Sequence, residues 1–159
     1  YGITLHVCDL LPKSRGRIRL SSADPKAKAV IEASYLSHPD DIDVLLNGLK
    51  LARQIMDAPA LATKTNREIY PGKSVQTDEE LIADIRARAE TIYHPVGTCR
   101  MGSDAASVVD PQGRVRGVGA LRVVDASIMP TIVSGNMNAP VYMIAEKGAE
   151  LVLQAAARS

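Results

Sequence analysis

The chain has 159 residues, enough to bury the core of one domain. Its 19 basic and 18 acidic residues nearly balance, so the chain has no excess of positive charge that would favour binding to nucleic acid or to an anionic membrane surface. No apolar stretch approaches the roughly 20 residues that a transmembrane helix needs.

The two cysteines indicate in which compartment of the cell the protein works. Cys8 and Cys99 lie far apart in the sequence, which favours an intracellular protein with free thiols. We therefore expect a cytoplasmic protein and leave association with a membrane open.

The chain begins in strand-like sequence and contains no Trp and no Phe, which is unusual for a domain that closes its own core. These features predict a segment of a longer chain.

The first 22 residues alternate apolar and polar side chains. The alternation covers residues 3–7 and returns over residues 17–20, a period of two that is typical of strands. Between them, residues 12–16 read Pro-Lys-Ser-Arg-Gly, a turn sequence. The pattern predicts a β-hairpin over residues 1–22, opening an antiparallel sheet.

Three later segments have helical periodicity. After an irregular stretch over residues 21–39, Asp40 or Asp41 can cap a helix over about 40–57. Residues 58–75 contain breakers and predict a loop.

A second helix, over about 78–91, begins with Thr77 and Glu80 in the spacing of a capping box. Residues 102–119 are rich in glycine and irregular, and residues 121–125 predict a short strand. A third helix covers about 139–156, with Asn138 or Asn136 as its N-cap. The elements together predict an α+β fold, an antiparallel sheet with flanking helices.

The stretch over residues 93–102, Tyr-His-Pro-Val-Gly-Thr-Cys-Arg-Met-Gly, holds one histidine firmly. Pro95 restricts His94 to extended backbone, and Gly97 permits a tight turn. A lone histidine beside a proline is more often a structural hydrogen bonder than a catalyst. A catalytic role for His94 is therefore favoured only if a second unusual stretch supports it.

That second stretch is Ser-Gly-Asn-Met-Asn-Ala-Pro over residues 134–140, which leads into the last predicted helix. Free N–H groups and the positive end of the helix dipole favour negative charge there. Asn136 offers both a donor and an acceptor. A histidine base, an asparagine and such a helix end suit the oxidation of an alcohol, which loses its proton to a base and its hydride to a flavin.

Four stretches match a known family in their order along the chain. The sequence resembles the C-terminal portion of the glucose-methanol-choline (GMC) oxidoreductases, which are FAD-dependent alcohol oxidases and dehydrogenases. The matching stretches are residues 12–16, 93–102, 121–130 and 135–147.

The resemblance implies that His94 and Asn136 are catalytic. It places Asp125 and Ala126 against the flavin or its ribityl chain, and it gives the backbone N–H groups of Met137 and Asn138 to the pyrimidine edge. It implies no metal site. Residues 1 to about 100 would belong to the substrate-side sheet, and the last forty would complete the FAD-binding domain with a strand and a helix.

The resemblance also implies what this segment lacks. The family's Gly-x-Gly-x-x-Gly fingerprint, which binds the FAD pyrophosphate, does not follow any predicted strand here. We expect residues 1–159 to be one GMC C-terminal domain that binds FAD only together with an N-terminal half. Alone, it would turn over little or nothing.

Asn136 makes the sequence more similar to the bacterial alcohol and choline dehydrogenases than to the fungal sugar oxidases. The expected substrate is a primary or similar small alcohol, and the electron acceptor is a quinone or oxygen. Choline is the alternative substrate, ranked lower because this segment has no aromatic cage beyond its Tyr residues. The alternative of another class is a stand-alone structural or interaction module without activity.

Overall fold

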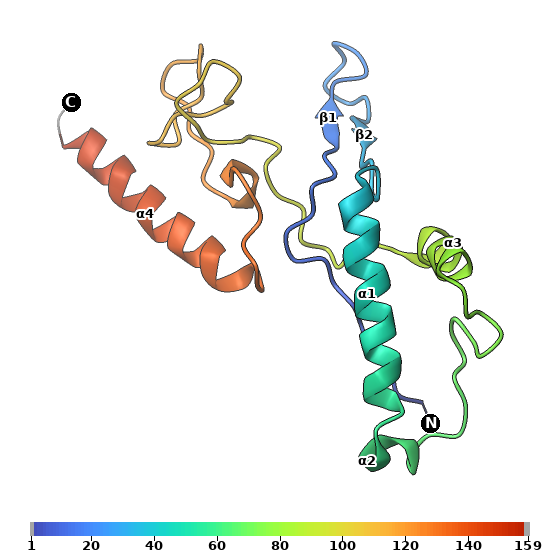
Figure 1. The fold of residues 1–159 in the computed structure, drawn as a ribbon. Helices are drawn as coiled ribbons and strands as arrows, with labels where there is room; N and C mark the ends of the chain where they lie inside the picture. Colours follow the sequence, from blue (N-terminus) through green and yellow to red (C-terminus); the bar gives the residue numbers. More distant parts are fainter. Residues whose placement is uncertain (1, 158–159) are drawn as a thin grey trace. The chain divides into compact units, whose positions relative to one another are not determined.

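A computed structural model describes residues 2–157, which form two compact units. The first unit extends to Glu90 and the second begins at Thr91. The elements of the first unit are β1 (Arg17–Arg19), β2 (Val30–Glu32), α1 (Pro39–Met56), α2 (Pro59–Ala62) and α3 (Asp78–Arg88) (Figure 1). The second unit contains the 3₁₀ helix η1 (Ala126–Ile128) and α4 (Asn138–Ala156).

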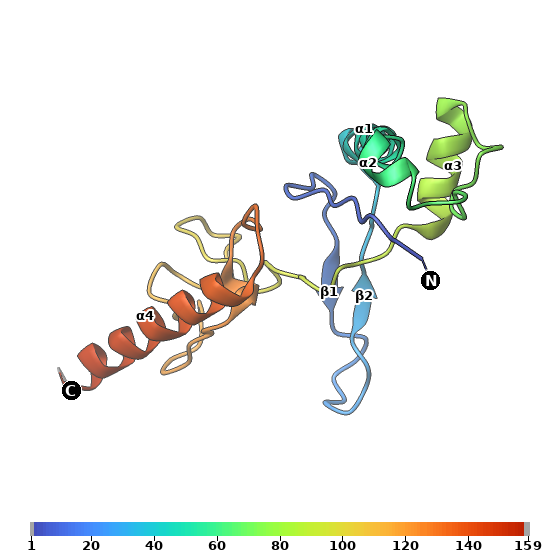
Figure 2. The same cartoon turned by 90° about the horizontal axis from the view of Figure 1, so that it is seen from below.

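The sheet of the first unit has two antiparallel strands, with Ile18 opposite Ile31 (Figure 2). Glu32 binds the two arginines of β1, and its Oε1 lies 2.7 Å from Nη2 of Arg19. The predicted hairpin over residues 1–22 is therefore wrong in its pairing. Its second strand exists, but the partner is β2, inside the stretch predicted to be irregular.

The first predicted strand, over residues 3–7, is not a strand because no backbone ladder pairs with it. The extended segment instead lies along α1, where a Cβ on Gly48 would collide with a methyl group of Val7. Leu5 and Val7 line a shallow groove there together with Leu51 and Ile55. Alternating side chains therefore contact a helix face instead of covering a sheet.

The predicted helices are confirmed as α1, α3 and α4, and the short α2 is an addition within a predicted loop. The core of the first unit lies between α1 and α3 and consists of Ile42, Leu46, Leu81 and Ile85. The capping box of α3 is confirmed in both directions. For α1 the prediction of the cap is wrong, because His38 accepts the Asp40 N–H at its Nδ1.

Asp41 has a different task from capping, and only 3% of the residue is exposed. Its carboxylate accepts the N–H of Lys13 at 2.7 Å and the N–H of Ser14 at 2.9 Å. The N–H of His38 donates to Ser14 Oγ at 3.0 Å. Burial acts to raise the pKa of Asp41, but the hydrogen bonds from Ser14 and Lys13 outweigh it and lower that pKa. These bonds fasten the Pro-Lys-Ser-Arg-Gly turn to the start of α1.

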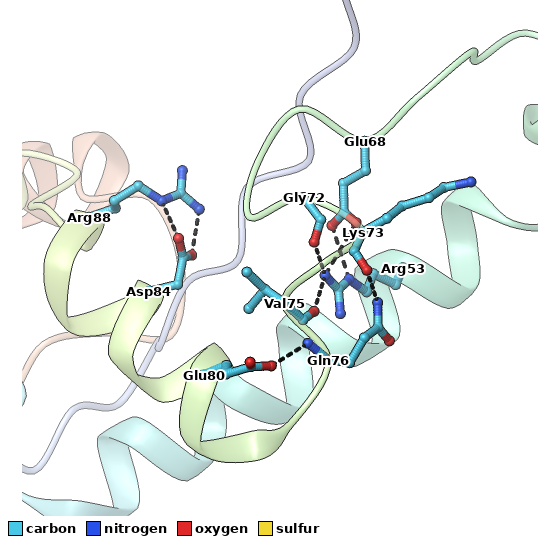
Figure 3. Close-up of polar contacts among 9 residues, drawn as sticks. All are labelled: Arg53, Glu68, Gly72, Lys73, Val75, Gln76, Glu80, Asp84 and Arg88. Atoms are coloured by element: carbon cyan, nitrogen blue, oxygen red, sulfur yellow. Dashed lines mark hydrogen bonds and ion pairs between the residues drawn. The ribbon is translucent and has the colours of Figure 1, made fainter.

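Arg53 of α1 holds the loop between α2 and α3 (Figure 3). Its guanidinium donates to both oxygens of Glu68 and to the carbonyl oxygens of Gly72 and Val75, at 2.9–3.2 Å. A planar group with several donors makes such a set of contacts, which a lysine could not. On α3, Arg88 pairs with Asp84, so this part of the unit is braced by ionic contacts.

The second unit is built mostly from loops around Val109, which is 0% exposed. Met101 and Val115 form isolated bridges with Val109. The strand predicted over residues 121–125 is wrong, because only Arg122 forms a bridge, with Arg114. An extended segment becomes a strand only when a neighbour pairs with it over several residues.

The helix α4 lies against these loops (Figure 1). A Cβ on Gly148 would collide with the side chain of Val124, so this glycine allows the helix to approach closely. The small sheet and the helices confirm an α+β fold. None of the helices within residues 2–157 has the length and apolar character required to cross a membrane.

Candidate active site

The loop that contains His94 is fixed downstream by backbone hydrogen bonds. The N–H of Cys99 donates to the carbonyl of Ser127 at 2.9 Å, and the N–H of Met101 donates to that of Ile128 at 2.8 Å. Gly97 has a φ of +84°, and a Cβ there would lie 3.2 Å from the carbonyl oxygen of Met129. Glycine is therefore needed where this loop turns against the segment after η1.

His94 itself is half-buried. Among the described residues, its imidazole takes part in no hydrogen bond or ion pair. The interpretation of His94 as a structural hydrogen bonder therefore gains no support from this part of the chain. Neither ring nitrogen has a hydrogen-bond partner among the described residues.

Ala126 begins η1, and Asp125 is its N-cap. The carboxylate of Asp125 accepts the Ser127 N–H at 2.7 Å and also the Ser127 hydroxyl, so it caps the 3₁₀ helix. Asp125 is exposed, whereas Ala126 is half-buried against the core of the second unit. One carboxylate oxygen of Asp125 thus has a structural task.

The start of α4 brings the other predicted residues. Asn136 and Asn138 are exposed, and Met137 between them is 7% exposed. The prediction that Asn138 or Asn136 caps this helix is wrong, because the N-cap is Met137 and no side chain caps the end. Within residues 2–157, the N–H groups of Met137, Asn138 and Ala139 have no acceptor. Three donors at the positive end of a 19-residue helix remain available.

One buried cluster joins these segments. Its members are Val109, Ile128, Met129, Met137 and Ile144, with Val96 and Ala126 packed against it. Each of the six predicted site residues belongs to this cluster or lies within two positions of a member. The structure therefore brings the three backbone segments together. No hydrogen bond of the described residues joins two of the six side chains.

Ionic contacts brace the loop that follows His94. Arg100 pairs with Asp104, with 2.8 Å between Nη2 and Oδ1, and this hydrogen-bonded guanidinium lowers the pKa of Asp104 to about 2. Asp110 pairs in the same way with Arg114, at 2.7 Å. These charged groups stabilise the loop. No group of three or more metal-ligating side chains occurs among the described residues.

The residues present fit one end of a flavin. The free N–H groups at the start of α4 suit the carbonyl acceptors of a pyrimidine ring, and Ala126 has only a methyl side chain. A Cβ built on Gly135 has no atom within 4 Å. The sequence contains no Gly-x-Gly-x-x-Gly motif for the pyrophosphate of FAD.

One feature of the site had almost no sequence signal. Tyr93 has a left-handed backbone, with φ of +65°, although it is neither glycine nor asparagine. The N–H of Tyr93 donates to the Thr91 hydroxyl at 2.9 Å. A threonine two residues earlier was the only cue to this turn.

Comparison with known proteins shows the family of the chain. Residues 12–145 match the GMC oxidoreductase family, and the chain belongs to that family. It is 60% identical over 154 residues to an alcohol dehydrogenase [acceptor] of Pseudomonas putida, covering 97% of this chain and 28% of that protein. It is 49% identical over 154 residues to oxygen-dependent choline dehydrogenase 1 of Chromohalobacter salexigens, covering 96% of this chain and 28% of that protein.

Solved structures show the same likeness. The chain superposes on a pyridoxine 4-oxidase from Mesorbium loti with a TM-score of 0.83 and 36% identity, covering 89% of this chain and 28% of that one. For an FAD-dependent oxidoreductase from Chaetomium thermophilum, the TM-score is 0.85 and the identity 31%, covering 91% of this chain and 25% of that one. The chain thus spans little more than a quarter of the relatives that it matches.

Proposed function

We propose that this chain is the C-terminal catalytic part of an FAD-dependent alcohol dehydrogenase. The observation that supports it most is the single buried cluster that fixes the segments of His94, Ala126 and Asn136 together. The 60% identity to an alcohol dehydrogenase [acceptor] supports the same reaction class. The substrate is a primary or similar small alcohol.

In this reaction His94 is the base. Its free imidazole takes the proton of the alcohol hydroxyl, while Asn136 donates a hydrogen bond to the same oxygen as negative charge develops there. FAD, when bound, would supply the acceptor for the hydride of the alcohol carbon. The free N–H groups at the start of α4 and its dipole favour the negative charge that this transfer brings.

Four residues would hold the flavin end of the cofactor. Met137 and Asn138 offer backbone N–H groups, and Ala126 gives close approach. Asp125 has one carboxylate oxygen engaged with Ser127, which leaves the other for the ribityl side. An N-terminal half of the same protein would supply the remaining FAD site, and residues 121–156 would complete its domain.

A choline dehydrogenase is the second candidate, favoured by the 49% identity to oxygen-dependent choline dehydrogenase 1. We rank it lower because the alcohol dehydrogenase is more similar and because the chain contains no Trp and no Phe for a cationic cage. The electron acceptor is a quinone or oxygen. We place the protein in the cytoplasm. If the acceptor is a membrane quinone, the protein would have to contact the membrane to reduce it.

The test is anaerobic stopped-flow reduction of the flavin in the full-length enzyme. His94→Ala removes the base, so the limiting reduction rate should fall by ~10²–10⁴-fold with FAD still bound. Asn136→Ala removes one hydrogen bond to developing charge, so its rate should fall by on the order of 10²-fold. FAD content, measured by absorbance, is the control for both variants.

The double variant sharpens the assignment. Because both side chains act on one oxygen, their combined loss should be smaller than the product of the single losses. Reduction of His94→Ala at the wild-type rate would refute the assignment. A full-length wild-type protein without a flavin spectrum would favour the stand-alone module instead.

A further inference from the structure

The residue before His94 has an unusual backbone. Tyr93 lies in the left-handed region, with φ of +65°. Non-glycine residues adopt this conformation uncommonly, and it persists only where the surroundings hold it. The Tyr93 residue is 79% exposed, so burial of its ring within this chain does not explain the conformation.

The hydroxyl of Thr91 holds the turn. Thr91 Oγ1 accepts the N–H of Tyr93 at 2.9 Å, and Thr91 itself is half-buried. On the other side of His94, Val96 packs against the buried cluster and Gly97 turns against the backbone of Met129. His94 therefore lies between a turn that the Thr91 hydroxyl stabilises and a residue, Val96, that is packed against the buried cluster.

The imidazole has little else to orient it. Within the described residues no hydrogen bond holds the ring of His94. Pro95 restricts the His94 backbone to extended conformations. The orientation of the His94 side chain therefore depends on the backbone before and after it. Tyr93 determines the backbone on the N-terminal side.

We propose that the left-handed conformation of Tyr93, held by the Thr91 hydroxyl, positions the His94 imidazole for proton removal. This inference rests on the proposed function. Tyr93 and Thr91 are positioning residues, since they act through His94 and take no proton themselves. The Tyr93 backbone, and not its ring, does the positioning.

The test compares two substitutions at Tyr93 in the full-length flavoenzyme. Tyr93→Gly removes the ring but adopts the left-handed backbone freely, so the limiting rate of flavin reduction should stay within about threefold of wild type. Tyr93→Ile keeps an apolar side chain but disfavours that backbone, so the rate should fall by ~10- to 100-fold. Substrate affinity, read from the concentration dependence of the reduction rate, should change little in either variant.

A second pair tests the hydroxyl. Thr91→Val removes the acceptor at nearly constant shape and should lower the reduction rate in the same direction, whereas Thr91→Ser keeps the acceptor and should preserve it. In a His94→Ala background, Tyr93→Ile should have no further effect, because the group that it positions is gone. A general structural defect would lower the rate in both backgrounds.

The outcomes separate the two proposals. Wild-type reduction by Tyr93→Ile, equal losses in the glycine and isoleucine variants, or an isoleucine effect that persists without His94 would each overturn the positioning inference. If His94→Ala itself reduces its flavin at the wild-type rate, the proposed function fails instead. If Tyr93→Ile does not retain FAD, the valine and serine variants of Thr91 decide.

Discussion

The two units are stabilised in different ways. In the first, two regular helices bury Leu81 and Ile85 between them, and ionic contacts such as that of Arg53 hold the connecting loop. In the second, Val109 is the most deeply buried residue, and loops surround it through isolated bridges and backbone hydrogen bonds. All six candidate site residues lie in the second unit. The segments of the candidate site are thus held by a buried cluster under irregular chain, and not by a regular sheet.

The largest effects should come from the two cores. Leu81 is 1% exposed, so Leu81→Ala should lower the free energy of local opening in the first unit by about 2–5 kcal/mol. Val109→Ala removes fewer atoms and should lower that of the second unit by about 2 kcal/mol. Amide hydrogen exchange of the full-length enzyme measures both.

Flavin reduction distinguishes these core variants. Val109→Ala loosens the cluster that holds the segments of His94 and Asn136, so the limiting reduction rate should fall. Leu81→Ala, in a separate cluster, should leave the rate per bound flavin unchanged. Equal losses of activity in both variants would contradict the difference drawn between the units.

An effect smaller than that of Leu81→Ala, and comparable with that of Val109→Ala, is expected at Asp41, the buried carboxylate among the described residues of the first unit. Asp41→Asn keeps the shape but removes the charge that accepts the N–H groups of Lys13 and Ser14. Hydrogen bonds to a charged group contribute about 1.5–3 kcal/mol, so thermal unfolding should shift to lower temperature by a corresponding amount. Asp43→Asn, which alters an exposed carboxylate on the same helix, is the matched control.

The pH dependence of that variant has a definite sign. The pKa of Asp41 is lower in the folded protein than its ordinary value of 3.8. Its stabilising effect is therefore complete above that value and is lost as the pH falls through the lowered pKa. The difference in melting temperature between wild type and Asp41→Asn should be constant from about pH 5 upward and shrink below about pH 4. A difference that grows on acidification would contradict the stabilising role of the Asp41 carboxylate.

The smallest effect tests a helix end. Thr77→Ala removes the side chain that accepts the Glu80 N–H at 3.2 Å, which should reduce the stability of α3 by about 1 kcal/mol. Glu79→Ala changes an exposed residue of the same turn that makes no such bond and should cost only a few tenths of a kcal/mol. Exchange of the first α3 amides gives the measurement. Similar effects in both variants would argue against the capping box.

The helices were predictable because their information is local. The periodic apolar positions and the pair Thr77 and Glu80 predicted α1 and α3 closely. The pairing of β1 with β2 was not predictable, because the alternation over residues 3–7 suits a strand and also suits a segment that lies on a helix. Choosing between the two requires knowing which distant segment is adjacent.

The segments of the candidate site could be selected from the sequence, and one buried cluster joins them. The contacts that support these segments could not be predicted. The stretches around His94 and Asn136 stood out because a proline restricts the backbone of His94 and because Asn136 lies just before the start of a predicted helix. The left-handed backbone of Tyr93 did not, since tyrosine has no preference for that conformation. The absent side-chain cap of α4 was also missed, because both asparagines suggested one.

The bonds of Asp41 and Ser14 have a consequence for how the chain can change in length. Lys13 and Ser14 meet His38 and Asp41, so the chain enters and leaves the β1–β2 excursion at nearly the same point. Closing a loop depends only weakly on its length once its ends are held. We therefore expect residues 21–28, between the strands, to accept insertions while α1 keeps its place, which makes this excursion a suitable position for a peptide tag.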